Sequence, residues 1–434
     1  MPERAVIVGL DLRSRKTSRQ EPAAAPRLNA TEESLAELVA LAATAGAEVV
    51  GQVVQSRHAP EAATLIGSGK VKELASLAEA AEADVVIFDH NLTPTQQRNL
   101  ETALDRKVID RTQLILDIFA RRARTREGQL QVELAQLDYI LPRLTGHGSE
   151  MSRLGGGIGT RGPGETQLET DRRRIFRRMR TVKADLEHVR RHRSVQRKQR
   201  QGVPIATAVL VGYTNAGKST LFNRMTGASV VADARLFATL DPTIRAITLP
   251  SRRKLLLSDT VGFIRDLPPS LIQAFRATLE EVTEASLLLH VVDAASPTAS
   301  HQVAEVQKVL AELGSENTPH LLVINKADIL AEATSAESFA SRLSGGHARA
   351  VMVSARTGEG LDRLAAEIDA MLPVDEVTRE RFRFPASDGF PLHVLHEFAR
   401  VLTTRYEGVY CEVEAEAPET VRKRLLRFLV KSGL

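Results

Sequence analysis

The chain has too few cysteines for the disulfides that stabilise small secreted domains, and it has no long apolar segment of the kind that crosses a membrane. Among its 434 residues there is one cysteine, Cys411, and no tryptophan. A single cysteine excludes an intrachain disulfide. The apolar run Leu287–Val292 ends at Asp293, well short of the roughly 20 residues that span a bilayer. The N-terminal apolar run 5–10 is too short for a signal-peptide core. We therefore expect no membrane span and a cytoplasmic location.

The chain does have length and unevenly placed positive charge. Its residues are 43% hydrophobic, enough for about three domains of ordinary size. The formal net charge of +4 is small, so local clusters of charge carry more information than the total. These properties predict a multidomain soluble protein, which we expect to be a monomer.

Residues 1–110 alternate short β-branched runs with amphipathic helical stretches. Strands are expected at Ala5–Leu10, Glu48–Val54, Asp84–Phe88 and Lys107–Ile109. This alternation is typical of a small parallel α/β domain. The Pro- and Arg-rich segment Arg13–Arg27 is expected to be a mobile loop.

Between residues 111 and 202 the strand pattern vanishes. Two long helical segments flank a glycine-rich stretch from Gly146 to Gly164. A helix from Glu165 to about Arg200 would be about 50 Å long at 1.5 Å per residue. This order predicts a helical hairpin arm with a flexible tip.

A second α/β alternation covers residues 203–372, and a tail covers residues 375–434. In the tail we expect a strand, a helix, a strand and a helix at Arg381–Phe384, Leu392–Leu402, Tyr410–Ala415 and Glu419–Val430. This order predicts a small α+β domain after the second alternation.

A glycine-rich segment, Gly212-Tyr-Thr-Asn-Ala-Gly-Lys-Ser-Thr220, follows the expected strand Ala206–Val211. It matches the phosphate-loop pattern G-x4-GK[ST] between a strand and a helix, which is the context that this loop requires. The Lys218 ammonium would reach the β and γ phosphate oxygens, and the Ser219 hydroxyl would bind Mg²⁺. Lys218 is therefore also a catalytic candidate. The residues expected to bind nucleotide here are Gly212, Asn215, Ala216, Gly217, Lys218, Ser219 and Thr220.

The segment Asp259-Thr-Val-Gly262 follows a further apolar strand. Asp259 would hold Mg²⁺ through water, and the N–H of Gly262 would meet the γ-phosphate, which makes Gly262 a second catalytic candidate. Many small GTPases carry a water-orienting glutamine at the next position, where this chain has Phe263. Phenylalanine cannot hydrogen-bond water, so slow intrinsic hydrolysis is expected unless a partner, a rearranged switch or an ion supplies the missing stabilisation.

Two further loops favour guanine over adenine. In Asn325-Lys326-Ala-Asp328, the Asp328 carboxylate can accept from the N1–H and 2-amino groups of guanine, and adenine offers neither donor. Ser354-Ala355 resembles the loop whose backbone N–H contacts guanine O6. All these loops stand in the required order at strand ends. We therefore predict GTP as the ligand and an α/β fold: a P-loop GTPase domain preceded by a small parallel α/β domain and a long helical-hairpin arm, and followed by a small α+β domain.

Two assignments at this site stay open. The switch threonine that binds Mg²⁺ is Thr239 or Thr243, and we favour Thr239. Asn215 lies where several GTPases that lack the glutamine use an asparagine to help bind K⁺, or it only stabilises the loop. Mg²⁺ is thus the expected cofactor, with K⁺ as a candidate addition.

The chain resembles the HflX family of translational GTPases over nearly its whole length. The resemblance rests on Ile66–Lys70, Asp110–Phe119, Gln131–Gln136, Gly155–Glu165, Leu236–Thr243, Asp259–Ile264 and the wording of the phosphate loop. It implies binding to the large ribosomal subunit, a role in splitting stalled or idle ribosomes, and a glycine-rich tip that reaches toward the peptidyl-transferase region. The resemblance also implies that the N-terminal domain is a candidate ATP site. However, Gly67-Ser-Gly-Lys70 in that domain is too short for a second phosphate loop.

The second arm helix is strongly basic. From Arg172 to Arg200 it carries 13 lysines and arginines against two acidic residues. Like charges at helical spacing repel one another, so an ordered arm favours a polyanion nearby. With 4% aromatic residues, recognition of the RNA backbone fits better than base stacking, although a solvated helix face is the alternative. The arginines expected to contact RNA are Arg153, Arg161, Arg172, Arg173, Arg174, Arg177, Arg178 and Arg180.

Rival functions remain. One alternative is a GTPase of ribosome assembly. Another is a signalling GTPase with a protein effector, which would have a neutral arm and little affinity for ribosomal RNA. An RNA-remodelling ATPase centred on the N-terminal domain would keep its ATP turnover when Lys218 is lost.

Overall fold

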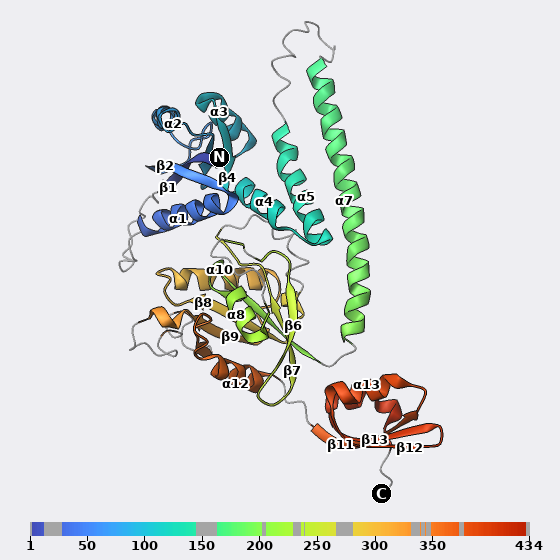
Figure 1. Ribbon diagram of the computed structural model, residues 1–434. Coiled ribbons are helices and arrows are strands. Elements are labelled where there is room, and N and C mark those ends of the chain that lie inside the picture. Colours follow the sequence, from blue (N-terminus) through green and yellow to red (C-terminus); the bar gives the residue numbers. More distant parts are fainter. Residues whose placement is uncertain are drawn as a thin grey trace.

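The structure is a computed structural model that describes residues 2–12, 28–144, 163–201, 205–228, 236–237, 239–265, 281–330, 339, 343, 349–372 and 377–430. In this part of the chain the strands form three sheets, and one long helix runs beside the first two of them (Figure 1). Within the same ranges, no helix has both the length and the apolar character that a membrane crossing needs.

The first sheet has four parallel strands, as predicted, and their order is β2-β1-β3-β4. Its strands are β1 (Glu3–Leu12), β2 (Ala47–Arg57), β3 (Val85–Phe88) and β4 (Lys107–Asp110), and its helices are α1 (Leu28–Ala45), α2 (Ser68–Ala80) and α3 (Pro94–Leu104). Successive side chains of β1 point to opposite faces. Ile7 packs with Leu38 of α1, and Val8 packs in the cluster that contains Leu74 of α2. Helices therefore cover both faces.

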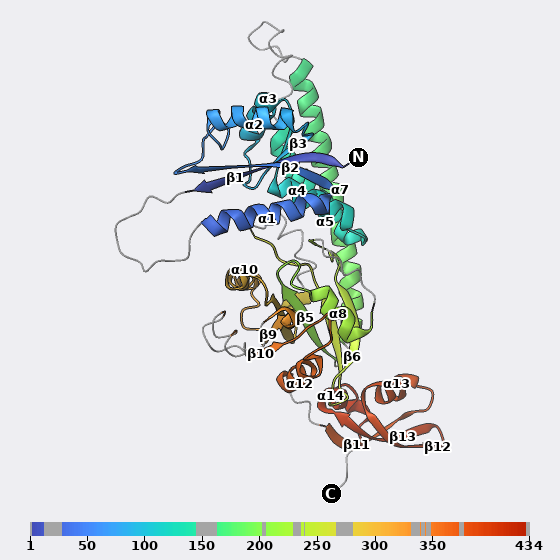
Figure 2. The ribbon, with the colours of Figure 1, turned by 60° about the vertical axis from the view of Figure 1, so that its left-hand side comes forward.

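The helical region contains α4 (Arg111–Arg122), α5 (Arg126–Ile140), the short 3₁₀ turn η1 (Leu141–Leu144) and α7 (Pro163–Gln201). The first of the two predicted helical segments is broken, because Thr125 caps a new helix by accepting from the N–H of Gly128 at 3.1 Å. Helix α4 packs on α1, whereas α5 and α7 form the hairpin around Leu130 and Val182 (Figure 2). Arg153, Arg161 and most of the predicted tip lie outside the described residues, as does the predicted loop Arg13–Arg27.

The second α/β domain has six strands in the order β10-β9-β8-β5-β7-β6. Its elements are β5 (Ala206–Gly212), α8 (Lys218–Thr226), β6 (Thr243–Thr248), β7 (Lys254–Asp259), β8 (Leu287–Asp293), α10 (Ala299–Glu312), β9 (His320–Asn325), η2 (Ala327–Ile329), β10 (Ala350–Met352) and α12 (Leu361–Met371). All pairs are parallel except β6 with β7. The edge strand β6 is absent from the sequence-based prediction. The carboxyl ends of β5, β7 and β9 carry the loops singled out above.

The last domain is a three-stranded antiparallel sheet in the order β11-β13-β12 with helices against it. Its elements are β11 (Val377–Pro385), α13 (Gly389–Phe398), β12 (Arg400–Glu407), β13 (Tyr410–Pro418), α14 (Glu419–Arg424) and η3 (Leu426–Phe428). Two predicted elements were wrong in extent. The helix expected to reach Leu402 ends at Phe398, since the next residues pair with β13, and a short apolar run does not distinguish helix from strand. The last helix ends at Arg424, and Leu429 forms a bridge with Phe382.

Helices α1 and α4 face the second α/β domain, and one apolar cluster joins the two domains (Figures 1 and 2). Phe119 of α4 contacts Phe237 edge to face, with ring centroids 4.6 Å apart. Phe237 belongs to the switch segment, residues 236–243, between α8 and β6. The N-terminal half of the chain therefore packs directly on the loops at the end of the second sheet.

Candidate nucleotide site and basic arm

The phosphate loop requires glycine at two positions. Gly212 has φ +148°, and a Cβ there would lie 2.2 Å from the carbonyl oxygen of Val291. Gly217 has φ +94°, and a Cβ there would lie 2.2 Å from Nδ2 of Asn325. Any other residue would push the loop away from its neighbours, so these glycines allow the backbone to wrap a phosphate closely.

Lys218 begins helix α8 beneath this loop. Its ammonium donates to the carbonyl oxygens of Gly212 and Tyr213 at 3.0 and 2.8 Å. Burial lowers the pKa of Lys218 to about 8, against the opposing charge of Asp259. A buried ammonium inside a glycine loop is suited to binding a phosphate group. The negative charge of the phosphate would raise the pKa of Lys218 and keep its side chain protonated.

Three oxygen-bearing side chains meet next to Lys218. The Ser219 and Thr239 hydroxyls each donate to the Asp259 carboxylate, at 2.7 and 2.9 Å, and are 2.8 Å from each other. The second carboxylate oxygen of Asp259 is buried and has no hydrogen-bond partner among the described residues, and burial raises the pKa of this carboxyl. Oxygen atoms arranged in this way fit Mg²⁺. Thr243 begins β6 and is not part of the described hydrogen bonds of this group, so the geometry favours Thr239.

The base-reading loops are joined by Asn325. Its amide donates to the carbonyl oxygen of Ala216 at 2.8 Å and accepts from the N–H of Ala355 at 3.0 Å. Lys326 pairs with Asp293 at 2.7 Å. The phosphate loop, the Asn-Lys-x-Asp loop and the Ser-Ala loop therefore form one unit.

The carboxylate of Asp328, which we expect to bind guanine, is held in place by two neighbouring side chains. Asp328 accepts from the Ser354 hydroxyl at 2.6 Å and pairs with Arg356. The hydrogen bond from Ser354 holds the pKa of Asp328 below its usual range. Arg356 and Asp293 are absent from the predicted set. Because Arg356 directly follows Ser354-Ala355, its position in the sequence could have identified it as a residue of this site. No motif in the sequence identified Asp293 in the same way.

The segment 259–263 is paired with the phosphate loop. Phe263 donates its N–H to Gly212 at 3.0 Å and accepts from the N–H of Thr214 at 2.7 Å. The Phe263 side chain is only 3% exposed and lies in the apolar cluster between the domains. It therefore neither faces nor polarises water. Gly262 lies so close to the loop that a Cβ there would be 3.0 Å from Nζ of Lys218, and Thr220 lies on the exposed side of the first turn of α8.

Tyr213 links this site to the N-terminal domain, which sequence patterns did not predict. Its hydroxyl donates to Glu37 of α1 at 2.7 Å and accepts from the N–H of Arg265 at 2.8 Å. Burial, and then the charge of Glu37, raises the pKa of Tyr213. Glu37 also pairs with Arg111, a guanidinium only 3% exposed that bonds Asp89 at 2.9 Å.

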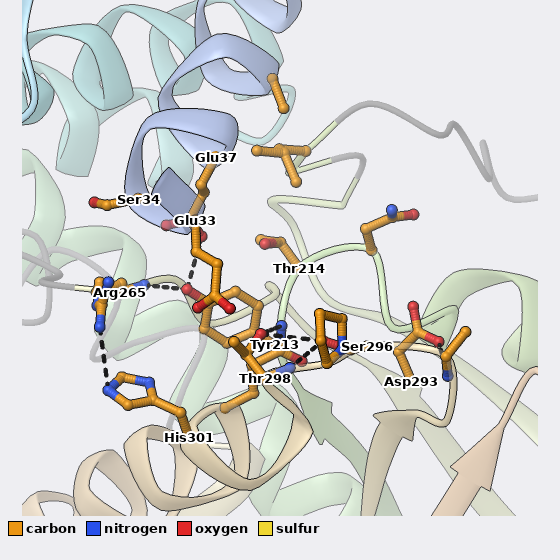
Figure 3. Close-up of a pocket in the computed structure, with 16 residues that line it drawn as sticks. Glu33, Ser34, Glu37, Tyr213, Thr214, Arg265, Asp293, Ser296, Thr298 and His301 are labelled. Atoms are coloured by element: carbon orange, nitrogen blue, oxygen red, sulfur yellow. Dashed lines mark hydrogen bonds between the residues drawn. The ribbon is translucent and has the colours of Figure 1, made fainter. Parts of the chain in front are cut away.

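A cavity of about 380 Å³ lies between α1 and the loops around Tyr213 and Ser296 (Figure 3). Glu33 and Glu37 line it from the N-terminal domain, and Thr214 and Asn215 line it from the phosphate loop. Asn215 is exposed and adopts φ +60°, a conformation that asparagine tolerates better than most residues. Both interpretations of Asn215 remain compatible with this position.

The arm arginines separate into two groups. Three of them pair with acidic residues of the hairpin: Arg173 with Glu169, Arg174 with Asp171, and Arg178 with Glu133. Arg172, Arg177 and Arg180 are exposed, and the structure shows no acidic partner for them among the described residues. These three are the arginines most available to an external polyanion.

The fold and the loops are those of a P-loop GTPase: a strand leads into a glycine loop around a buried lysine, next to a hydroxyl and carboxylate cluster suited to a cation and a carboxylate suited to guanine. Family models agree. The chain matches models described as GTP-binding GTPase N-terminal over residues 32–120, GTP-binding GTPase Middle Region over residues 122–200, and 50S ribosome-binding GTPase over residues 207–326.

Curated relatives then identify the family. The chain is 48% identical to GTPase HflX of Caldanaerobacter subterraneus subsp. tengcongensis, over 92% of this chain and 91% of the relative. It is 46% identical to GTPase HflX of Escherichia coli, over 82% and 83% of the two chains. The chain belongs to the HflX family of GTPases and hydrolyses GTP. Among solved structures, a GTP-binding protein of Sulfolobus solfataricus in complex with GDP aligns over 86% of this chain and 98% of its own, at 24% identity and a TM-score of 0.45.

Proposed function

We propose that this chain is a GTP-driven factor that binds the large ribosomal subunit through its basic arm and splits stalled or idle ribosomes. Its intrinsic hydrolysis is slow and is stimulated by the ribosome. Membership of the HflX family and the match to a model described as a 50S ribosome-binding GTPase support this proposal. In this role the chain acts as a monomer in the cytoplasm.

The observation that carries the proposal is the attachment of the switch segment to the arm. Asp241 accepts from the N–H groups of Arg124 and Thr125 at 2.9 Å and from the Thr125 hydroxyl, at the start of α5. Thr239, two residues earlier, lies in the proposed Mg²⁺ cluster. A change at the γ-phosphate therefore reaches the base of the hairpin through three residues of chain, which is the geometry of a nucleotide-controlled switch.

The residues of the site have distinct tasks. Mg²⁺, when bound, neutralises charge on the β and γ phosphates, and the Ser219 and Thr239 hydroxyls would hold it directly while Asp259 acts through water. The Lys218 ammonium holds the β and γ oxygens, and the N–H of Gly262 orients the γ-phosphate. The Phe263 side chain cannot hydrogen-bond the attacking water, so the ribosome would supply stabilisation that this side chain does not.

The arm provides affinity for RNA. Arg172, Arg177 and Arg180 project from α7 without acidic partners in the described chain, and each can release a counterion when it binds a phosphate. Arg178 is occupied by Glu133 and stabilises the hairpin instead. Substitutions in the arm should therefore change the affinity for RNA, and substitutions in the switch segment should change how that affinity depends on the bound nucleotide.

The test is sedimentation of the full chain with purified large subunits in a non-hydrolysable GTP analogue or in GDP. We expect co-sedimentation with the analogue and release with GDP, and a loss of light scattering when intact ribosomes are added. Asp241→Ala removes the acceptor of both N–H groups and of the Thr125 hydroxyl, so this variant is expected to bind subunits with little difference between nucleotides. Asp362→Ala, on the exposed side of α12, is the matched control and should behave as wild type.

Other outcomes decide between the rivals. Binding only to immature subunits would indicate a ribosome-assembly factor. Binding to no ribosomal particle in either nucleotide would contradict the proposal and favour a signalling GTPase.

A further inference from the structure

Thr214, the third residue of the phosphate loop, has a buried hydroxyl with no hydrogen-bond partner among the described residues. The residue is 7% exposed, and its Oγ1 makes no hydrogen bond within the described part of the chain. Its backbone N–H is already used by Phe263. A buried hydroxyl without a partner costs stability, and buried polar groups in native proteins are nearly always paired. The position therefore calls for a ligand.

The hydroxyl belongs to the residue that borders the γ-phosphate end of the site. A Cβ on Gly262 would lie 2.8 Å from Cα and Cγ2 of Thr214 and 3.0 Å from Nζ of Lys218. Gly262, the methyl group of Thr214 and the Lys218 ammonium thus lie close together, and the Thr214 hydroxyl is on the same Cβ as that methyl group. In a phosphate-loop site the lysine and this glycine both face the γ-phosphate. Thr214 also lines the cavity of about 380 Å³ under α1, which is large enough for water (Figure 3).

We propose that Thr214 is a catalytic residue of GTP hydrolysis, whose hydroxyl donates a hydrogen bond to an oxygen of the γ-phosphoryl group. It supplies part of the stabilisation that Phe263 cannot provide. This proposal depends on the GTPase reaction and not on the ribosomal role.

The hydroxyl acts without changing its own protonation. A water oxygen forms the new bond to the γ-phosphorus, and the bond from that phosphorus to the β–γ bridging oxygen breaks. The electron pair of the broken bond stays on GDP, and the proton lost by water goes to the released phosphate or to solvent. Thr214 keeps its proton and stabilises negative charge on the phosphoryl oxygens throughout.

An unpaired donor is well suited to this task. A hydroxyl that already bonded a protein carbonyl would have to break that bond before meeting substrate, whereas the Thr214 hydroxyl is desolvated and available. A hydrogen bond to the γ-phosphate would compensate for the cost of burying this hydroxyl. The unpaired hydroxyl therefore lowers the stability of the nucleotide-free protein but favours hydrolysis.

The test compares Thr214→Val, which keeps the shape and removes the hydroxyl, with Thr214→Ser, which keeps the hydroxyl. We expect single-turnover hydrolysis by the valine variant to fall roughly tenfold to a hundredfold. Its affinity for GDP should stay within about threefold of wild type, because GDP lacks the γ-phosphate. The nucleotide-free valine variant should have an equal or higher Tm, since an unpaired polar group is removed. The serine variant should hydrolyse GTP within about threefold of wild type.

Thr260→Val is the matched control for Tm. The Thr260 hydroxyl is buried and donates to the carbonyl oxygen of Leu210 at 2.6 Å, so its loss should lower Tm. The proposal is overturned if Thr214→Val hydrolyses GTP at the wild-type rate. It is also overturned if Tm falls as it does for Thr260→Val, or if the serine and valine variants lose activity equally, because the hydroxyl would then have a structural role or none.

Discussion

The hydroxyl of Tyr213 in the phosphate loop donates a 2.7 Å hydrogen bond to the carboxylate of Glu37 on α1. The two residues are 176 positions apart in the chain. The same hydroxyl accepts from the backbone of Arg265, just beyond the segment that faces the γ-phosphate. Glu37 continues the connection to the buried Arg111. One side chain therefore connects the nucleotide site with the ion pairs of the N-terminal domain.

Tyr213→Phe should weaken this connection. We expect the free energy of unfolding to fall by about 1–2 kcal/mol, because a part-buried hydrogen bond to a carboxylate is lost. The nucleotide dependence of subunit binding should weaken as well. Denaturant unfolding and sedimentation measure the two effects. Tyr406→Phe, at a residue 65% exposed in the last domain, is the control, and an equal effect of both substitutions would contradict the assignment.

Asp328→Asn should change the preferred base. The carboxylate that accepts two guanine donors becomes an amide whose N–H₂ group suits the C2 oxygen of xanthine. Affinity for GTP should fall by about a hundredfold or more, since buried donors of the base lose their acceptor, and xanthosine triphosphate should bind better than GTP. A nucleotide titration measures both affinities. Unchanged GTP affinity would remove Asp328 from the base site.

Nucleotide binding should take up a proton at alkaline pH. Burial lowers the pKa of Lys218 to about 8, and the charge of a bound phosphate would raise it. Below this pKa the lysine is charged in both states and takes up nothing. Above it, GDP binding must recharge the amine, so affinity falls as pH rises. Calorimetric titrations in two buffers of different ionisation heat, at about pH 7 and about pH 9, measure the uptake, and equal uptake at both would contradict this assignment.

The potassium interpretation of Asn215 predicts a salt effect on rate. Replacing Na⁺ by K⁺ at equal ionic strength should raise the rate of GTP hydrolysis, because a correctly sized cation would stabilise charge between the phosphates. Asn215→Ala should remove the difference between the two salts. Equal wild-type rates in both salts would leave Asn215 as a residue that only shapes the loop.

Neutralising Arg172, Arg177 and Arg180 together should weaken binding to the large subunit and flatten its salt dependence. Each lost phosphate contact should reduce the log slope by roughly one unit, with duplex DNA as a guide. GTP affinity should stay unchanged, since the loops lie in a separate domain. Arg178→Gln should change the slope less, because Glu133 already holds this guanidinium. Wild-type binding by the triple variant across a salt series would make the arm a solvated spacer.

From the sequence alone one could predict the order of the domains, most elements of the two α/β domains, the GTPase class and the family. These features are local: a glycine loop between strand and helix, or a tetrad at a strand end, needs only neighbouring residues. The long basic helix was readable for the same reason. Periodicity was insufficient for β12, where Val401 and the residues after it pair with β13, because sheet pairing decided between helix and strand.

Contacts between segments that are distant in the sequence depend on the tertiary structure. Thr239 rather than Thr243 joins Ser219 and Asp259, although both threonines stand in one short motif. Asp241 meets the start of α5 across 116 residues. The Thr214 hydroxyl is buried without a hydrogen-bond partner in the described part of the chain, and only the packed structure shows this. Burial and hydrogen bonding depend on which segments pack together, and no period or motif in the sequence encodes that choice.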